Sequence, residues 1–291
     1  MRVIDSHVHV VDNGRPLPEM LSEMHAAFAR CGFDGVCFAV NTCEGFNAIH
    51  RNLLAFLYKL TYPTGTYVYA GLDYHLPGTG HDDFGFAAQA QRMAAIGADG
   101  YKMYEGKPNA RKVCGSIPLT HALYGAFYQT LEQKDLPLAL HLADPPEFWD
   151  LNAAAEDQVG HGWFFGDLTH ASWQQLYSEV TAVIAAHPGL NIIIPQMGYL
   201  PPDLKHMERL LSAYPNLYFD IAPAGNTYRD IADRPAVWGE FIRAHAERLL
   251  FACTGVCADW SEAHKKPRAM RAALEGLGLG EETLSLLYYE N

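Results

Sequence analysis

The stretch Val3-Ile4-Asp5-Ser6-His7-Val8-His9-Val10 combines the apolar spacing of a strand with two histidines two positions apart. Because side chains alternate along a strand, Asp5, His7 and His9 share one face. Two imidazoles about 7 Å apart along the backbone can converge on one cation at a strand end. The alternative is a buried strand whose histidines only hydrogen-bond to their neighbours. The Asp-x-His-x-His pattern favours the metal site.

Length and composition limit the classes of protein that fit. The chain has 291 residues, which suits one barrel of about 250 residues plus loops, or two ordinary domains. A hydrophobic content of 49% allows a large core, and a net charge of −12 argues against nucleic acid or an anionic membrane as partner. No apolar run approaches the ~20 residues of a spanning helix, and no targeting segment is visible. We therefore expect a cytoplasmic protein.

Strand and helix patterns alternate along the whole chain. Eight apolar or β-branched segments predict strands, at residues 3–10, 35–40, 66–72, 99–104, 136–142, 191–196, 216–221 and 248–253. Helical spacing follows each of them, at residues 18–30, 52–60, 84–96, 119–134, 172–187, 203–213, 236–246 and 265–274. Eight such units predict one α/β domain over residues 1–291, a single (β/α)8 TIM barrel.

The Asp5-x-His7-x-His9 motif on the first strand resembles that of the amidohydrolase superfamily of metal-dependent hydrolases. The resemblance is to its decarboxylase-like branch, which contains aminocarboxymuconate-semialdehyde decarboxylase. It implies a barrel with a metal at the C-terminal ends of the strands, where His141 is the expected third ligand beside His7 and His9. The segments from Lys102 to Lys107 and after His141 resemble one uncharacterised bacterial subgroup.

Two positions depart from the superfamily pattern. Gln196 occupies the place of the usual strand-six His, and Thr254 that of the strand-eight Asp, which binds metal in relatives. Three His ligands with an open fourth position still make a competent zinc site, although Mn or Fe also suits imidazole. We expect one divalent metal, most readily Zn, at partial occupancy. Asp5 is expected to orient one of the ligand histidines without binding the metal itself.

Loss of the Asp removes a general base, an effect worth about 10²–10⁴ in rate. Asp220, at the end of strand seven, and Glu105 or Asp259 are candidate replacements. Lys102 is costly inside an apolar strand unless it is paired or functional. It is either an interior Lys paired with Glu105 or Asp73, or a catalytic residue of the site.

A long segment from Ala143 to Ala171 follows strand five and is rich in Pro, Trp, Phe and Gly. Its length exceeds that of a passive loop, so we expect it to cover the barrel mouth with Trp149 or Trp163 facing the site. Packing on its own side chains is the alternative. The candidate substrate-binding residues are Asp144, Trp149, Gln196 and Thr254.

Three functions fit these observations. The first is a metal-dependent hydrolase or decarboxylase of a small carboxylated or cyclic substrate. The second is a catalytically degenerate barrel that binds a small ligand or partner, and the third is a metal-independent lyase or hydrolase using Lys102. A homodimer formed through outer helices and loops is expected by analogy with related barrels.

Overall fold

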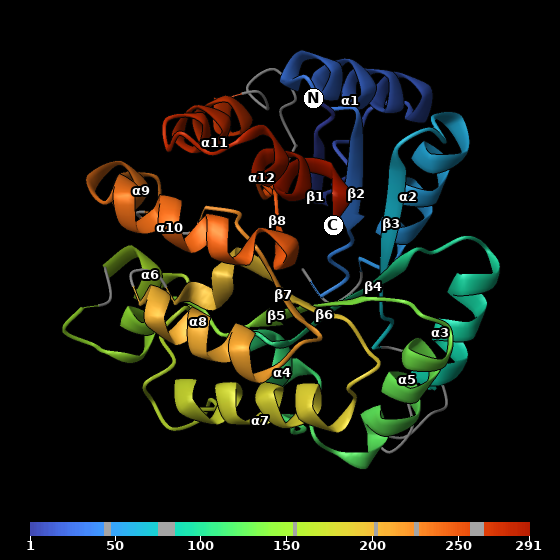
Figure 1. Ribbon diagram of the computed structural model, residues 1–291. Coiled ribbons are helices and arrows are strands. Elements are labelled where there is room, and N and C mark those ends of the chain that lie inside the picture. Colours follow the sequence, from blue (N-terminus) through green and yellow to red (C-terminus); the bar gives the residue numbers. More distant parts are fainter. Residues whose placement is uncertain (44–47, 75–84, 154–155, 201–202, 224–226, 257–264) are drawn as a thin grey trace.

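Parallel strands and helices alternate along the chain and close into a barrel (Figure 1). The computed structural model describes residues 1–291 except 44–47, 75–84, 154–155, 201–202, 224–226 and 257–264. The strands are β1 (Ile4–His9), β2 (Gly35–Ala39), β3 (Thr66–Gly71), β4 (Gly100–Gly106), β5 (Leu138–Leu142), β6 (Ile192–Ile194), β7 (Leu217–Asp220), β8 (Leu249–Leu250) and β9 (Gly255–Val256). All of them pair in parallel, in the order β8-β7-β6-β5-β4-β3-β2-β1-β9.

The barrel closes through an eighth strand that is interrupted. β8 pairs with β7, whereas β9 pairs with β1 at the other end of the same segment. Between them, the backbone N–H of Ser6 donates a hydrogen bond of 3.0 Å to the carbonyl oxygen of Phe251. The first and last strands are therefore joined, and the predicted (β/α)8 barrel is confirmed.

Helices follow the strands and lie on the outside of the barrel (Figure 1). The main ones are α1 (Leu17–Cys31), α2 (His50–Thr61), α3 (Phe86–Ala95), α5 (Ala122–Gln133), α7 (Trp173–Ala186), α8 (Leu204–Ala213), α10 (Pro235–His245) and α11 (Lys265–Glu275). Each of these overlaps a helix predicted from the apolar spacing. In the described part of the chain, no helix has the length and apolar character needed to span a bilayer.

Short helices were not predicted, because few residues carry their periodicity. They are α4 (Pro108–Val113), η2 (Pro146–Trp149), α6 (Glu156–Gly160), η3 (Pro195–Tyr199), α9 (Thr227–Asp233), η4 (Ala246–Arg248), α12 (Glu281–Ser285) and η5 (Leu286–Glu290). Several of them lie in the connections at the carboxyl ends of the strands, which is the end where a barrel of this kind builds its site.

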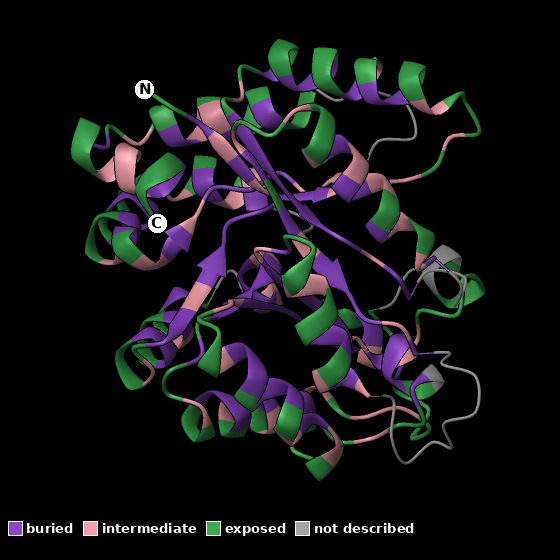
Figure 2. Ribbon diagram, turned by 90° about the vertical axis from the view of Figure 1, so that its right-hand side faces the viewer, coloured by how far each residue is buried: buried purple, intermediate pink, exposed green. Residues whose placement is uncertain are grey.

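The strands form the core, and the helices are buried only on the face that covers them (Figure 2). Every residue of β2, β4 and β5 is buried. Several ionisable residues are buried with them, namely Asp5, His7, Lys102, Glu105, His141, Asp144 and Asp220. Burying such groups is costly unless they are paired or used, so their concentration on the strands points to a site.

Candidate active site

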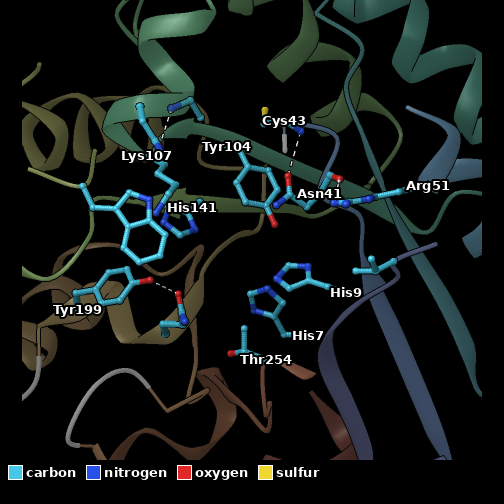
Figure 3. Close-up of a pocket in the computed structure, with 15 residues that line it drawn as sticks. His7, His9, Asn41, Cys43, Arg51, Tyr104, Lys107, His141, Tyr199 and Thr254 are labelled. Carbon is cyan, nitrogen blue, oxygen red and sulfur yellow. Dashed lines mark hydrogen bonds between the residues drawn. The ribbon is translucent and has the colours of Figure 1, made fainter. Parts of the chain in front are cut away.

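A cavity of about 580 Å³ opens at the carboxyl ends of the strands (Figure 3). Three histidines line it, two from β1 and one from β5. The other lining residues are Val11, Asn41, Cys43, Arg51, Tyr104, Lys107, Asn109, Ala110, Trp163, Gln196, Tyr199 and Thr254. The cavity therefore combines imidazoles, two basic side chains, amides and aromatic rings, which is the usual mixture of a small-molecule site.

His7 is fixed by a carboxylate on β7, which only the interrupted eighth strand separates from β1. Its Nδ1 lies 2.7 Å from Oδ2 of Asp220, the last residue of β7, and both side chains are buried. This contact leaves Nε2 of His7 without a hydrogen-bond partner in the described residues. Burial and the nearby Lys102 lower the pKa of His7 despite the Asp220 charge. The ring therefore presents Nε2 as a free, uncharged donor atom for a metal or substrate.

His9 is oriented by the backbone of the next strand. Its Nδ1 lies 2.8 Å from the carbonyl oxygen of Ala39 in β2, so Nδ1 carries the proton and Nε2 is the basic atom. The rings of His7 and His9 meet edge to face, with their centroids 4.8 Å apart. Burial, followed by the neighbouring His7, lowers the pKa of His9 well below its ordinary value. The motif of β1 thus delivers two neutral imidazoles side by side.

His141 enters the cavity from β5, where Gly106 lets the neighbouring strand approach. A Cβ at position 106 would collide with the His141 carbonyl oxygen. The ring of His141 stacks on the ring of Tyr104, with their centroids 5.6 Å apart. The centroid of the Tyr104 ring lies 6.5 Å from that of His9 (Figure 3). Burial lowers the pKa of His141 to about 4, so this imidazole is also neutral.

A partly buried ion pair lies beside His141. Nζ of Lys107 donates to both oxygens of Asp144 at 2.6 and 2.8 Å, and Oδ1 of Asp144 lies 3.7 Å from Nε2 of His141. That last distance is longer than a hydrogen bond. Burial opposes ionisation of Asp144, but His141 and Lys107 outweigh it and lower its pKa. Asp144 is thus occupied by Lys107 and is not among the residues that line the cavity.

The donor set has the chemistry of a divalent-metal site. Three neutral imidazoles face one cavity, and Nε2 of both His7 and His141 is buried without a hydrogen-bond partner in the described residues. In the present arrangement, no three His, Cys, Asp or Glu side chains of the described chain lie close enough together to hold an ion. The residues fit the metal by ligand type, and His141 lies across the cavity from His7 and His9 (Figure 3).

Asp5 contacts backbone rather than an imidazole. Its Oδ1 accepts hydrogen bonds of 3.1 Å from the backbone N–H groups of His7 and Cys253. Burial raises its pKa to about 7. The side chain that orients His7 is Asp220, so the supporting role expected of Asp5 acts on the strand backbone, between β1 and the interrupted eighth strand.

Lys102 and Glu105 lie within β4, below the cavity. Nζ of Lys102 makes no hydrogen bond to a described residue and lies 5.0 Å from the centre of the Tyr104 ring. Burial lowers the pKa of Lys102 to about 7. Glu105 accepts hydrogen bonds from the Tyr74 hydroxyl and the Tyr104 N–H, and burial raises its pKa to about 7. Both groups have pKa values suited to proton transfer at neutral pH, but neither lines the cavity.

Gln196 and Thr254 both line the cavity, as do the three histidines. The backbone N–H of Gln196 donates to Oδ1 of Asp220 at 2.6 Å, so one carboxylate holds both His7 and the end of β6. Oγ1 of Thr254 is buried without a hydrogen-bond partner in the described chain. Asp259, another candidate base, lies outside the described residues.

The family model for amidohydrolases matches residues 4–253. The chain belongs to the amidohydrolase family. No curated protein matches the sequence of this amidohydrolase at a significant level.

Solved structures share the barrel of this amidohydrolase at low sequence identity. One is 4-oxalomesaconate hydratase from Rhodopseudomonas palustris, at 15% identity and TM-score 0.65 over 99% of this chain and 93% of that one. Another is a candidate 2-pyrone-4,6-dicarboxylic acid hydrolase from Pseudomonas putida, at 17% identity and TM-score 0.59 over 99% and 94%. A third is a zinc-bound amidohydrolase from Burkholderia multivorans, at 12% and 0.58 over 99% and 96%. The family supports an enzyme of the hydrolase or lyase type, and these neighbours share its fold.

The segment after β5 contributes one aromatic side chain to the amidohydrolase cavity. Trp163 lines it, whereas the indole N–H of Trp149 donates to the carbonyl oxygen of Ala171 and its ring packs on Phe165. Of the two tryptophans, Trp163 therefore faces the site. Trp149, which was expected to bind substrate, lies within the segment's own packing and is not a lining residue.

Several lining residues were not among those singled out from the sequence. Asn41 and Arg51 follow β2, Tyr104 and Lys107 follow one another around the end of β4, and Tyr199 ends η3. Asn41, Tyr104, Lys107 and Tyr199 share a signal, because each lies within three residues of the carboxyl end of a predicted strand. Arg51 lies in α2 and carries no such signal.

Proposed function

We propose that this amidohydrolase is a metal-dependent hydrolase or decarboxylase of a small carboxylated substrate. The observation that carries the proposal is the pair of buried, unpartnered Nε2 atoms of His7 and His141 on one 580 Å³ cavity. Unpartnered buried imidazole nitrogens are costly unless a ligand satisfies them. His7, His9 and His141 would hold the ion, and zinc, manganese or iron suits such donors.

A bound divalent cation supplies Lewis acidity toward a substrate oxygen or water. The chain itself supplies orientation, because Asp220 and Ala39 fix the tautomers of His7 and His9. Asp220 is a weak base, since His7 and Lys102 overcome the effect of burial and lower its pKa. Lys102 and Glu105, both with a pKa of about 7, have values that suit proton exchange near neutral pH, but neither is among the residues that line the cavity.

Two features favour a carboxylated substrate. Arg51 lines the cavity with a cationic side chain, whereas Lys107, which also lines it, is paired with Asp144. Two structural neighbours carry names that refer to carboxylated compounds, 4-oxalomesaconate and 2-pyrone-4,6-dicarboxylic acid. The aromatic rings of Tyr104, Trp163 and Tyr199 would contact the rest of a small, flat substrate.

The test is an activity screen on metal-stripped and reconstituted protein. Lactones, esters, amides and decarboxylation substrates, each with a carboxylate, are assayed after chelation and after addition of Zn²⁺, Mn²⁺ or Fe²⁺. We expect turnover only after reconstitution, and its loss in His7→Ala and His141→Ala. His25→Ala is the matched control, because this His stacks on Tyr62 away from the cavity.

Each alternative has its own result in this screen. Turnover that survives chelation and the histidine substitutions would establish a metal-independent lyase or hydrolase using Lys102. Stoichiometric metal without turnover of any substrate in the panel would support a barrel that binds a ligand or partner instead.

A further inference from the structure

The end of β6 forms a left-handed turn on the cavity wall. Four consecutive residues, Gln196, Met197, Gly198 and Tyr199, have φ values of 55°, 52°, 61° and 56°. Only one of them is glycine, and a left-handed conformation costs other residues about 1–2 kcal/mol each. Such strain persists only where the surroundings enforce it, and it concentrates at ligand sites.

Contacts from two other elements enforce the turn. Oδ1 of Asp220 accepts the Gln196 N–H, and the hydroxyl of Tyr177 in α7 donates to the Gly198 carbonyl oxygen. A Cβ at Gly198 would lie 2.6 Å from that hydroxyl, so only glycine fits there. The turn is therefore tied to the carboxylate that also orients His7.

The strained turn brings two of its side chains together on the cavity. The Tyr199 hydroxyl donates a hydrogen bond to Oε1 of Gln196, and both residues line the cavity (Figure 3). The hydroxyl is the donor in this pair and the amide oxygen is the acceptor.

This hydrogen bond determines what Gln196 offers to a ligand. With Oε1 accepting from Tyr199, Nε2 is the amide atom left without a partner, and it offers two N–H bonds. Nε2 makes no hydrogen bond to any residue that the structure describes. Gln196 therefore faces the cavity as a donor, and reversing its amide would break the hydrogen bond between the Tyr199 hydroxyl and Oε1.

We propose that Tyr199 is a positioning residue that locks Gln196 as a hydrogen-bond donor, so that this wall selects ligands with an acceptor oxygen, such as a carboxylate or carbonyl. The proposal rests on the proposed function for its setting, because it assigns specificity within the same site. A neutral amide donor recognises the oxygen without removing a proton from the substrate.

Two probes of nearly equal shape test this directly. Benzoate presents only acceptor oxygens, and benzamidine presents only N–H donors. Both are titrated calorimetrically into the full-length protein and its variants in one buffer. We expect the unmodified protein to prefer benzoate, and Gln196→Glu, which replaces the donor by an acceptor, to shift the ratio of the two Kd values toward benzamidine by at least about tenfold, or 1.4 kcal/mol.

Two further variants separate the lock from simple charge. Asn41→Asp makes the same amide-to-acid change elsewhere in the cavity and should shift the ratio by less than about threefold. Tyr199→Phe adds no charge but frees the amide to rotate, and should reduce the preference for benzoate several-fold. Circular dichroism checks that each variant is folded, and a crystal structure with benzoate should place a carboxylate oxygen within hydrogen-bond distance of Gln196 Nε2.

Equal shifts in Gln196→Glu and Asn41→Asp, an unchanged ratio in Tyr199→Phe, or benzoate bound away from Gln196 would each overturn the proposal. So would the absence of benzoate binding at millimolar concentration. None of these results depends on turnover or on added metal, so the proposed function can fail or stand separately. A Tyr199→Phe protein that does not fold leaves the decision to the benzoate complex of the unmodified protein.

Discussion

Oδ2 of Asp220 lies 2.7 Å from Nδ1 of His7, although 213 residues separate the two in the sequence. The other oxygen of the same carboxylate accepts the Gln196 N–H at 2.6 Å. One side chain of β7 thus sets both the tautomer of a candidate metal ligand and the position of the turn after β6. A substitution of Asp220 should therefore alter two walls of the cavity.

Asp220→Asn tests this dual role. The amide keeps the shape but can hold His7 in the wrong tautomer, so we expect zinc affinity and kcat/KM to fall about 10- to 100-fold. Chelator competition and steady-state kinetics measure the two effects. Asp99→Asn is the control, since Asp99 also binds a backbone N–H and a lysine, outside the cavity. Asp99→Asn should lower stability and leave zinc affinity unchanged. An equal loss of zinc affinity in both variants would contradict the dual role of Asp220.

The pKa of Asp220 also predicts a pH dependence. His7 and Lys102 lower that pKa in the folded protein, although burial acts against them. A carboxyl whose folded pKa is depressed stabilises the fold above its ordinary pKa, about 3.9, and the contribution is lost as pH falls through the folded value. The free energy of unfolding should therefore drop less steeply in acid in Asp220→Asn than in the unmodified protein, as urea titrations from neutral pH downward would show.

Lys102→Met should stabilise the protein at neutral pH. Burial lowers the Lys102 pKa from 10.5 to about 7, so the unfolded chain binds the extra proton between those values and stability rises with pH there. Methionine fills similar space without a charge, and we expect a gain of about 3 kcal/mol at pH 7 that shrinks toward pH 10. Urea unfolding at both pH values measures it. Lys134→Met, at an exposed position, should leave the stability unchanged at both pH values. A loss of stability in Lys102→Met would show that the Lys102 amine is paired.

Thr254→Asp should strengthen metal binding. Thr254 lines the cavity, its Oγ1 has no hydrogen-bond partner in the described chain, and its φ of 47° is one that aspartate tolerates comparatively well. A neutral three-His set offsets none of the 2+ charge, so we expect partial, exchangeable metal in the unmodified protein. The variant should bind at least about tenfold more tightly, or 1.4 kcal/mol. Chelator competition decides; equal affinity would mean that position 254 does not reach the ion.

Gly198→Ala should lower the free energy of unfolding by more than the strain of a left-handed alanine alone explains. Strain at φ 61° accounts for about 1–2 kcal/mol, and the contact with the Tyr177 hydroxyl adds to it. Gly14→Ala has φ 73° with open space around the new methyl group, so it measures strain without collision. Comparing the free energies of unfolding isolates the steric part. Equal losses would mean that the turn moves away from Tyr177 at no cost.

The fold could be predicted from the sequence because its signals are local. Apolar spacing marks a strand or helix within about ten residues, and eight alternations leave few topologies other than a closed barrel. The break of the eighth strand between Leu250 and Gly255 was not predicted. It depends on backbone hydrogen bonds to Asp5 and Ser6 at the other end of the chain, which no local pattern records.

The site could be predicted only in part, because some of its contacts join residues far apart in the sequence. His7, His9, His141, Gln196 and Thr254 all line the cavity, as their places at strand ends indicated. The partner of His7 could not be read from the sequence, since any buried acid on another strand would serve. Nor could the left-handed turn of η3, because three of its four residues are of types that normally avoid that conformation.

The hydrogen bond from the backbone of Cys253 to Asp5 spans 248 residues and has a consequence for assembly of the enzyme. The β1 histidines leave the ribosome long before the segment that secures their strand. Contacts between residues so far apart in sequence form late, because the entropic cost of closing the intervening chain must be met before the contacts stabilise the fold. Until the eighth strand pairs with β1, the strand that carries the two imidazoles lies at an open edge of the sheet. A nascent chain therefore carries these candidate ligands through the synthesis of the intervening 248 residues without the geometry to use them.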